Sequence, residues 1–192
     1  MKKIKQLARI FVWVSLLSFS SLSLADGISL RQLQFEQAEQ SWVVNASYTI
    51  DLPADLSEAV KKGITFHFIT ELNVTRGRWY WFEEKPITAI KSIKLSYQPL
   101  TQVYRVSVGG LTLSATTLEE ALLQVGAIAG WQVAEVAALD PSSDYDGAIR
   151  MRLDLSQLPK PFQINALNAR EWNLSSGWST FVIPRRNRHS GK

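Results

Sequence analysis

The densest cluster of side chains that could bind a ligand is Arg78-Trp79-Tyr80-Trp81, an arginine followed by alternating aromatic residues. Successive side chains of a β-strand point to opposite faces, so Trp79 and Trp81 share one face of such a strand. If that face is exposed, the two indole rings form a stacking platform for a sugar, a peptide or a lipid headgroup. Arg78 would then be available for a carboxylate or a phosphate.

The alternative interpretation of the two tryptophans is packing in the core. An unbroken strand over residues 64–82 would expose both rings, but it would be far longer than the usual strand of about five or six residues. Arg76-Gly77 is a natural place for a β-bulge, and a bulge there exchanges the two faces of the strand. We therefore favour a core position for both rings.

A second possible binding surface consists of arginines on other expected strands. Arg150 and Arg152 share one strand face with Asp154, and Arg105 lies at a similarly outward position on another strand. Together the arginines could form a carboxylate-binding patch. The alternative is a set of cross-strand ion pairs on a solvated sheet face, which contribute about 0.2 to 1 kcal/mol each and need no ligand.

Residues for catalysis or metal binding are sparse. His67 and Glu71 share a strand face but lie about 13 Å apart along the strand, too far to hold one metal ion without a bend. Asp140, Asp144 and Asp146 suggest a calcium loop, yet the closing glutamate of such a loop is missing, and the stretch is typical of a plain turn. The sequence thus predicts no catalytic residue, no metal ligand and no cofactor site.

The elements that must position these residues are mostly strands. Apolar and polar residues alternate over residues 41–52, 64–75 and 149–155, which is typical of half-buried strands. Gly109-Gly110 predicts a tight hairpin turn, and Ser175-Ser176-Gly177 predicts a last hairpin between residues 171 and 183. We expect a mainly β fold, either an antiparallel β-sandwich or a strongly curved sheet.

Two short helices are expected on this sheet, over about residues 55–62 and 117–129. The second has the stronger signal, because Thr117 and Glu120 form a capping box and apolar residues follow at helical spacing. Gly130 would end it.

The first 25 residues have the layout of a secretory signal peptide. Four basic residues precede an apolar run of about fifteen residues, and Ser23 and Ala25 offer a cleavage site before Asp26. The expected organisation is a leader over residues 1–25, a single β-rich domain over 26–184 and a basic flexible tail over 185–192. An uncleaved leader would instead tether the protein to the inner membrane.

Charge excludes one class of partner. The whole chain carries 21 basic and 17 acidic side chains, a formal charge of +4. Removal of the leader takes away four basic residues and no acidic one, which leaves a neutral chain. Nucleic acid is therefore not an expected partner. The chain has no cysteine, so disulfides and thiolate sites are excluded.

The sequence also resembles the proteobacterial domain of unknown function family 4390, over roughly residues 28–182. The motifs that carry the resemblance are, in chain order, Arg78-Trp79-Tyr80-Trp81, Leu95-Ser96-Tyr97 with Leu100-Thr101 and Tyr104-Arg105-Val106, Leu118-Glu119-Glu120-Ala121-Leu122, Arg150-Met151-Arg152-Leu153-Asp154, Leu158-Pro159-Lys160-Pro161 and Glu171-Trp172.

What this resemblance implies is a small exported protein of a Gram-negative bacterium, without an established activity. Such proteins are often encoded beside a two-component system whose membrane histidine kinase resembles the nitrogen-sensing type. The expected function is that of a periplasmic, non-enzymatic binding or accessory protein, with that kinase or another envelope protein as its partner. The alternatives are a structural or assembly factor of the envelope, whose strand edges pair with a partner, and a hydrolase with an unrecognised site.

Overall fold

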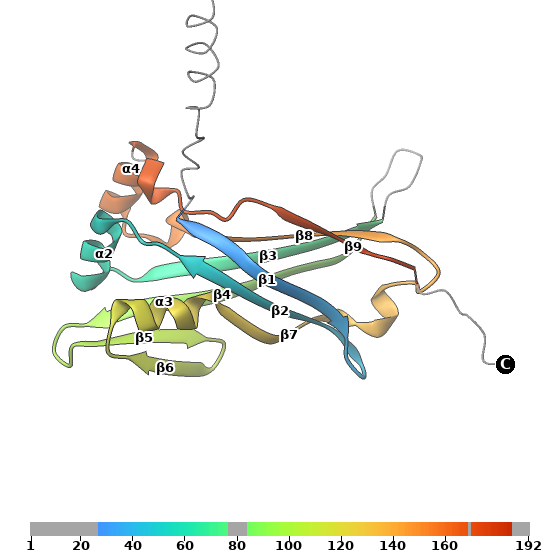
Figure 1. Cartoon of the computed structure of the whole chain (residues 1–192). Coiled ribbons are helices and arrows are strands. Elements are labelled where there is room, and N and C mark those ends of the chain that lie inside the picture. Colours follow the sequence, from blue (N-terminus) through green and yellow to red (C-terminus); the bar gives the residue numbers. More distant parts are fainter. Residues whose placement is uncertain (1–26, 77–83, 169, 186–192) are drawn as a thin grey trace, which may run out of the picture.

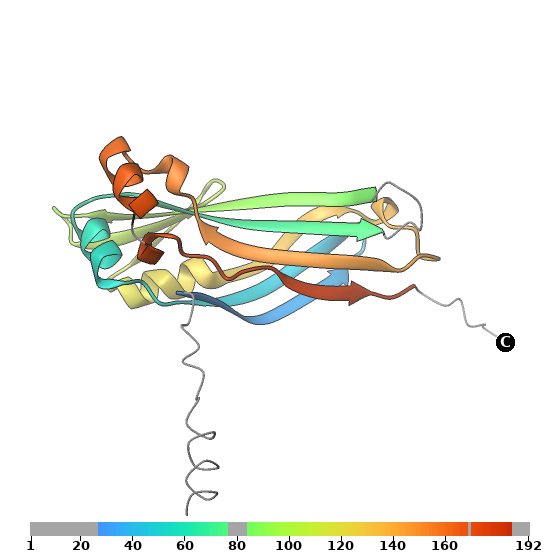
Figure 2. The ribbon, with the colours of Figure 1, turned by 90° about the horizontal axis from the view of Figure 1, so that it is seen from above.

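The computed structural model describes residues 27–76, 84–168 and 170–185. Within them the chain forms two antiparallel sheets that pack face to face around one core, which confirms the mainly β fold (Figures 1 and 2). The small sheet has the order β1 (Ile28–Gln37), β2 (Ser41–Ile50), β7 (Ala127–Glu135). The large sheet has the order β6 (Leu111–Ala115), β5 (Val103–Val108), β4 (Glu84–Gln98), β3 (Phe66–Arg76), β8 (Tyr145–Leu153), β9 (Ser179–Ile183).

The core follows from the alternation of apolar residues along the strands. In β3 the side chains of Phe66, Phe68, Leu72 and Val74 are fully buried against the small sheet. Glu71 lies between them in sequence and points to the outer face of the large sheet. Burial of such apolar side chains contributes about 1.5 to 3 kcal/mol each, so the alternation determines which face of the strand is turned inward.

The helices gather at one end of the sandwich (Figure 1). They are α2 (Ala54–Lys61), α3 (Leu118–Gly126) and α4 (Lys160–Asn168), with the 3-10 turns η2 (Leu155–Gln157) and η3 (Arg170–Trp172). The other end carries the β1–β2 hairpin, the 3-10 turn η1 (Val136–Ala138) and the end of β9. None of the helices in the described part of the chain is long and apolar enough to cross a bilayer.

The second helix is shorter than its sequence predicts. Helix α3 begins as expected, with Thr117 Oγ1 accepting a hydrogen bond from the Glu120 amide at 3.1 Å. It ends at Gly126 rather than at residue 129, and the next residues form β7. The reason is tertiary: β7 supplies the backbone partners that one edge of β2 needs, and it buries Ile128 in the core.

One further expectation was wrong in this region of the chain, and one helix there was not expected. The predicted last hairpin between residues 171 and 183 does not form, because β9 pairs with β8 instead. Helix α4 was not predicted from the sequence. Pro159 directly precedes this helix and Pro161 lies in its first turn, where a missing amide costs little. The Gly109-Gly110 hairpin between β5 and β6 is confirmed.

Candidate functional site

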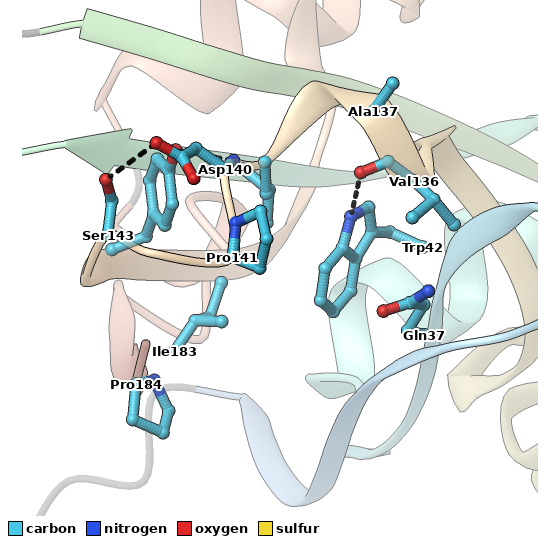
Figure 3. A pocket seen from close by; sticks show the side chains of 11 residues that line it. Gln37, Trp42, Val136, Ala137, Asp140, Pro141, Ser143, Ile183 and Pro184 are labelled. Atoms are coloured by element: carbon cyan, nitrogen blue, oxygen red, sulfur yellow. Dashed lines mark hydrogen bonds between the residues drawn. The ribbon is translucent and has the colours of Figure 1, made fainter. Parts of the chain in front are cut away.

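A pocket of about 390 Å³ lies at the end of the sandwich that is opposite to the helices (Figure 3). We call it the end pocket. Three segments far apart in sequence form it: the β1–β2 hairpin, the connection from β7 to β8, and the end of β9. Its lining residues are Gln37, Trp42, Val136, Ala137, Leu139, Asp140, Pro141, Ser143, Tyr145, Ile183 and Pro184.

Trp42 forms one wall of the end pocket. Its indole stacks on the ring of Phe35, with ring centroids 5.0 Å apart and an interplanar angle of 11°. Its Nε1–H donates a hydrogen bond to the carbonyl oxygen of Val136 at 3.3 Å. The ring is thus held from two sides, by β1 and by η1, and it forms a rigid apolar surface.

The opposite wall is a turn that begins at Asp140. One carboxylate oxygen of Asp140 accepts hydrogen bonds from the amide and the hydroxyl of Ser142, at 2.9 and 2.7 Å. The other accepts from the hydroxyl of Ser143 at 3.4 Å. The amide of Asp140 donates to the buried Tyr145 hydroxyl at 2.9 Å. This confirms the turn that the sequence predicts there.

The hydrogen bonds to Asp140 also favour the ionised form of its carboxyl group. The backbone and side-chain hydrogen bonds from Ser142 hold the pKa of Asp140 below its ordinary value. Asp140 is therefore a carboxylate at neutral pH, and a carboxylate with a lowered pKa is a poor general base. The polar wall of the end pocket can accept hydrogen bonds from a ligand, but it is badly suited to activating the nearby serine.

Arg150 and Arg152 come together on the outer face of the large sheet, around Glu71 of the neighbouring strand. Nε of Arg150 donates to one carboxylate oxygen of Glu71, and Nη2 of Arg152 lies 3.1 Å from the other. Arg152 also lies 3.7 Å from Asp154. On its other side, the Arg150 guanidinium lies 4.4 Å from the ring centre of Trp178.

For Arg150 and Arg152, this arrangement favours the ion-pair alternative over a carboxylate-binding patch. A carboxylate of the protein itself already lies between the two guanidinium groups, as in the ion-pair alternative. Arg105 lies on the same outer face but on β5, three strands away from β8 in the sheet order. Since adjacent strands are about 4.8 Å apart, Arg105 does not join the cluster.

The remaining residues singled out in the sequence have separate positions. Arg78, Trp79 and Trp81 lie outside the described residues. His67 shares the outer face with Glu71, as its alternation predicts, and lies opposite Lys94. Its pKa is lowered first by burial and then by Lys94, while Asp154 opposes this shift. Among the described residues, no group of three or more potential metal-ligating side chains converges.

The end pocket itself was missed by sequence reasoning. The alternation over residues 41–52 puts Trp42 on the same face of its strand as the buried Val44 and Ala46, and the residues from Asp140 were correctly interpreted as a turn. The missing information was that these segments and the end of β9 meet. A tryptophan at the mouth of a hairpin was a weak signal for such a wall, and no local pattern links residues 42 and 183.

Comparisons with known proteins give one finding. The family model described as "Domain of unknown function (DUF4390)" matches residues 25–182. Searches of curated proteins and of solved structures found no similar protein.

Proposed function

This chain belongs to the DUF4390 family of domains of unknown function, and we propose that it is a non-enzymatic binding module whose end pocket takes an apolar ligand. The observation that carries the proposal is the end pocket, whose walls are mainly apolar and carry only a few polar side chains (Figure 3). A volume of about 390 Å³ lies within the range of about 300 to 1,000 Å³ that is typical of small-molecule sites.

The chemistry of the lining residues favours binding over reaction. The buried hydroxyl groups of the end pocket already make hydrogen bonds inside the protein. Tyr145 accepts one from the Asp140 amide, and Ser143 donates one to the Asp140 carboxylate. A serine nucleophile needs a base that can take its proton near neutral pH, and Asp140 has a lowered pKa. An apolar ligand with one hydrogen-bond donor directed at Asp140 fits this arrangement.

The proposed location is the periplasm, reached through the leader over residues 1–25. The layout of basic, apolar and small residues in this leader supports export. There the protein would act as an accessory to a membrane histidine kinase or to another envelope protein. In this proposal the end pocket reports the presence of its ligand to that partner.

A substitution at the rim tests the end pocket. Ala137 is exposed at the pocket and small, so Ala137→Trp places a large ring where the ligand would enter. With the neutral fluorescent probe N-phenyl-1-naphthylamine, we expect the wild-type protein to bind and Ala137→Trp to bind at least about tenfold more weakly. The readout is the rise in probe fluorescence on titration.

The matched control is Ala129→Trp, which adds the same ring at an exposed position of β7 that does not line the end pocket. This variant should bind the probe like the wild-type protein. Equal binding by Ala137→Trp and the wild-type protein, or loss of binding in Ala129→Trp alone, would contradict the proposal.

A specific observation favours the assembly factor as a second candidate. Strand β9 pairs with β8, and no other described strand pairs with its second edge. Beside it, the inward side chains of β1, Leu30, Leu33 and Phe35, are only half buried, whereas Val44 of β2 is fully buried. Residues of β1 and β9 line a hollow between these two edge strands, so this edge of the sandwich is only partly covered. An extended partner segment with alternating apolar residues would complete this layer.

In-cell photo-crosslinking distinguishes this second candidate. With a photoreactive amino acid at Thr180, an exposed position of β9, we expect capture of one defined envelope protein. The same amino acid at Ala129 should not capture it. Recovery of the histidine kinase would also support the accessory role, and equal capture from both positions would count against a partner at the β9 edge.

A further inference from the structure

The outer face of the large sheet carries an exposed tryptophan that is held in place. Trp178 immediately precedes β9 and is 44% exposed. Its ring is in cation–π contact with Arg150, whose guanidinium lies 4.4 Å from the ring centre. An exposed indole that is held by a neighbouring cation offers a flat apolar surface without the entropy cost of ordering a free side chain.

The cation under this ring is itself fixed. Glu71 accepts hydrogen bonds from both Arg150 and Arg152, and its side chain is only 17% exposed. Asp154 lies beside Arg152 at 3.7 Å. Two guanidinium groups therefore face two carboxylates, and the cluster is close to neutral. A second anion would meet little uncompensated positive charge there.

Next to the tryptophan lies a shallow hollow of about 160 Å³. Trp178 and the 64% exposed Ile90 line it together with polar side chains from three neighbouring strands, Asn73 and Glu71 of β3, Thr88 of β4 and Arg150 of β8. The hollow is far smaller than a typical drug-sized pocket. It accommodates one ring of a ligand whose remainder lies across the open sheet face.

The combination of groups selects the class of ligand. A pyranose ring has an apolar C–H face and a rim of hydroxyl groups that both donate and accept hydrogen bonds. Trp178 offers the apolar surface, while Asn73, Thr88 and Arg150 offer donors and Asn73 and Glu71 offer acceptors. A lipid chain would leave these polar groups desolvated without partners, which is costly.

We infer that this hollow is a glycan-binding site, in which a pyranose ring stacks on Trp178 and hydrogen-bonds to the polar side chains of β3, β4 and β8. The site lies on the outer face of the large sheet and shares no lining residue with the end pocket. It is therefore independent of the proposed ligand of the end pocket.

Calorimetric titration of the purified protein with oligosaccharides tests the inference. The probes are chitohexaose, cellohexaose, maltohexaose and the core oligosaccharide of lipopolysaccharide. We expect the wild-type protein to bind at least one of them, and Trp178→Ala to bind the same probe at least about tenfold more weakly. Trp178→Phe should lose less affinity, because it keeps an aromatic face. Asn73→Ala should also weaken binding.

The choice of probe distinguishes the sources of the sugar. Binding of chitohexaose supports a cell-wall glycan, binding of the lipopolysaccharide core supports an outer-membrane glycan, and binding of the glucose oligomers supports a soluble or storage glucan. The control is Val182→Ala, an exposed apolar residue of β9 outside the hollow, which should bind like the wild-type protein. Ala137→Trp should also keep full glycan affinity.

Two results would overturn the inference. One is the absence of binding of all four probes to the wild-type protein. The other is unchanged affinity in a Trp178→Ala variant that retains the wild-type circular dichroism spectrum.

Discussion

Replacing Gly126 with alanine is expected to lower the free energy of unfolding by about 2 to 3 kcal/mol. Gly126 is the last residue of α3, directly before β7. A Cβ atom at this position would lie 2.2 Å from the carbonyl oxygen of Tyr48 and 3.2 Å from its carbonyl carbon. Both are backbone atoms of β2, so no side chain can rotate away.

Two effects of this substitution oppose each other. Alanine is favoured over glycine within a helix by about 1 kcal/mol, which by itself would stabilise α3. The contact with Tyr48 instead forces the helix end or β2 to move inside a closely packed core, and core tolerance for added atoms is low. We therefore expect the steric effect to be the larger one.

Urea unfolding followed by tryptophan fluorescence measures the effect. The control is Gly110→Ala, since no atom lies within 4 Å of a Cβ at that position and its backbone is not left-handed. This control should change the free energy of unfolding by less than about 1 kcal/mol. Equal unfolding midpoints for the Gly126→Ala and wild-type proteins would show that α3 does not press on β2 in this way.

Replacing Glu71 with alanine is expected to lower the free energy of unfolding by about 2 kcal/mol at neutral pH. The variant loses the hydrogen bonds to Arg150 and Arg152 and leaves two half-buried guanidinium groups facing each other. The two positively charged guanidinium groups would repel each other, and Arg150 would no longer be fixed beneath Trp178. The variant is therefore also expected to weaken glycan binding.

The effect of Glu71 should depend on pH. Burial alone would raise the pKa of Glu71, but the hydrogen bonds and charges of Arg150 and Arg152 outweigh it, and the pKa is lowered. A carboxyl group whose pKa is lowered by folding stabilises the folded state fully when the pH is above the pKa of the unfolded state, about 4.5. This contribution disappears as the pH falls through the folded-state pKa. The difference in the free energy of unfolding between the Glu71→Ala and wild-type proteins should thus become smaller below pH ~4.5.

The matched control for Glu71 is Glu58→Ala. Glu58 pairs with Lys62 on α2, but both side chains are more than half exposed. An exposed pair of this kind is screened by solvent, so Glu58→Ala should unfold at nearly the wild-type urea concentration. If both variants behave alike at neutral pH, burial of the Glu71 cluster has no energetic importance.

Local patterns predicted much of this fold, because they report on the face of an element that must be buried. The alternation over residues 64–75 identified the inward face of β3, and the Gly109-Gly110 pair identified the β5–β6 hairpin. Thr117 and Glu120 identified the start of α3. Each of these signals lies within a few residues and concerns groups that interact locally.

Other features depended on distant partners. The end of α3 could not be predicted, since residues 127–129 continue the helical pattern but are needed as the partner strand of β2. The pairing of β9 with β8 replaced the expected last hairpin for the same reason. The ion-pair alternative for Arg150 and Arg152 was stated from sequence, yet Glu71 as their shared partner required the β3–β8 register.

By itself, the sequence of this protein determined a mainly β fold, the faces of its main strands, and the family to which it belongs. These properties follow from the period of the residue pattern and from short motifs, which do not depend on how distant segments meet. Only the tertiary structure decided the end pocket and the hollow beside Trp178. Both are formed by segments far apart in the chain, and their proximity results from strand register and sheet packing rather than from any local preference.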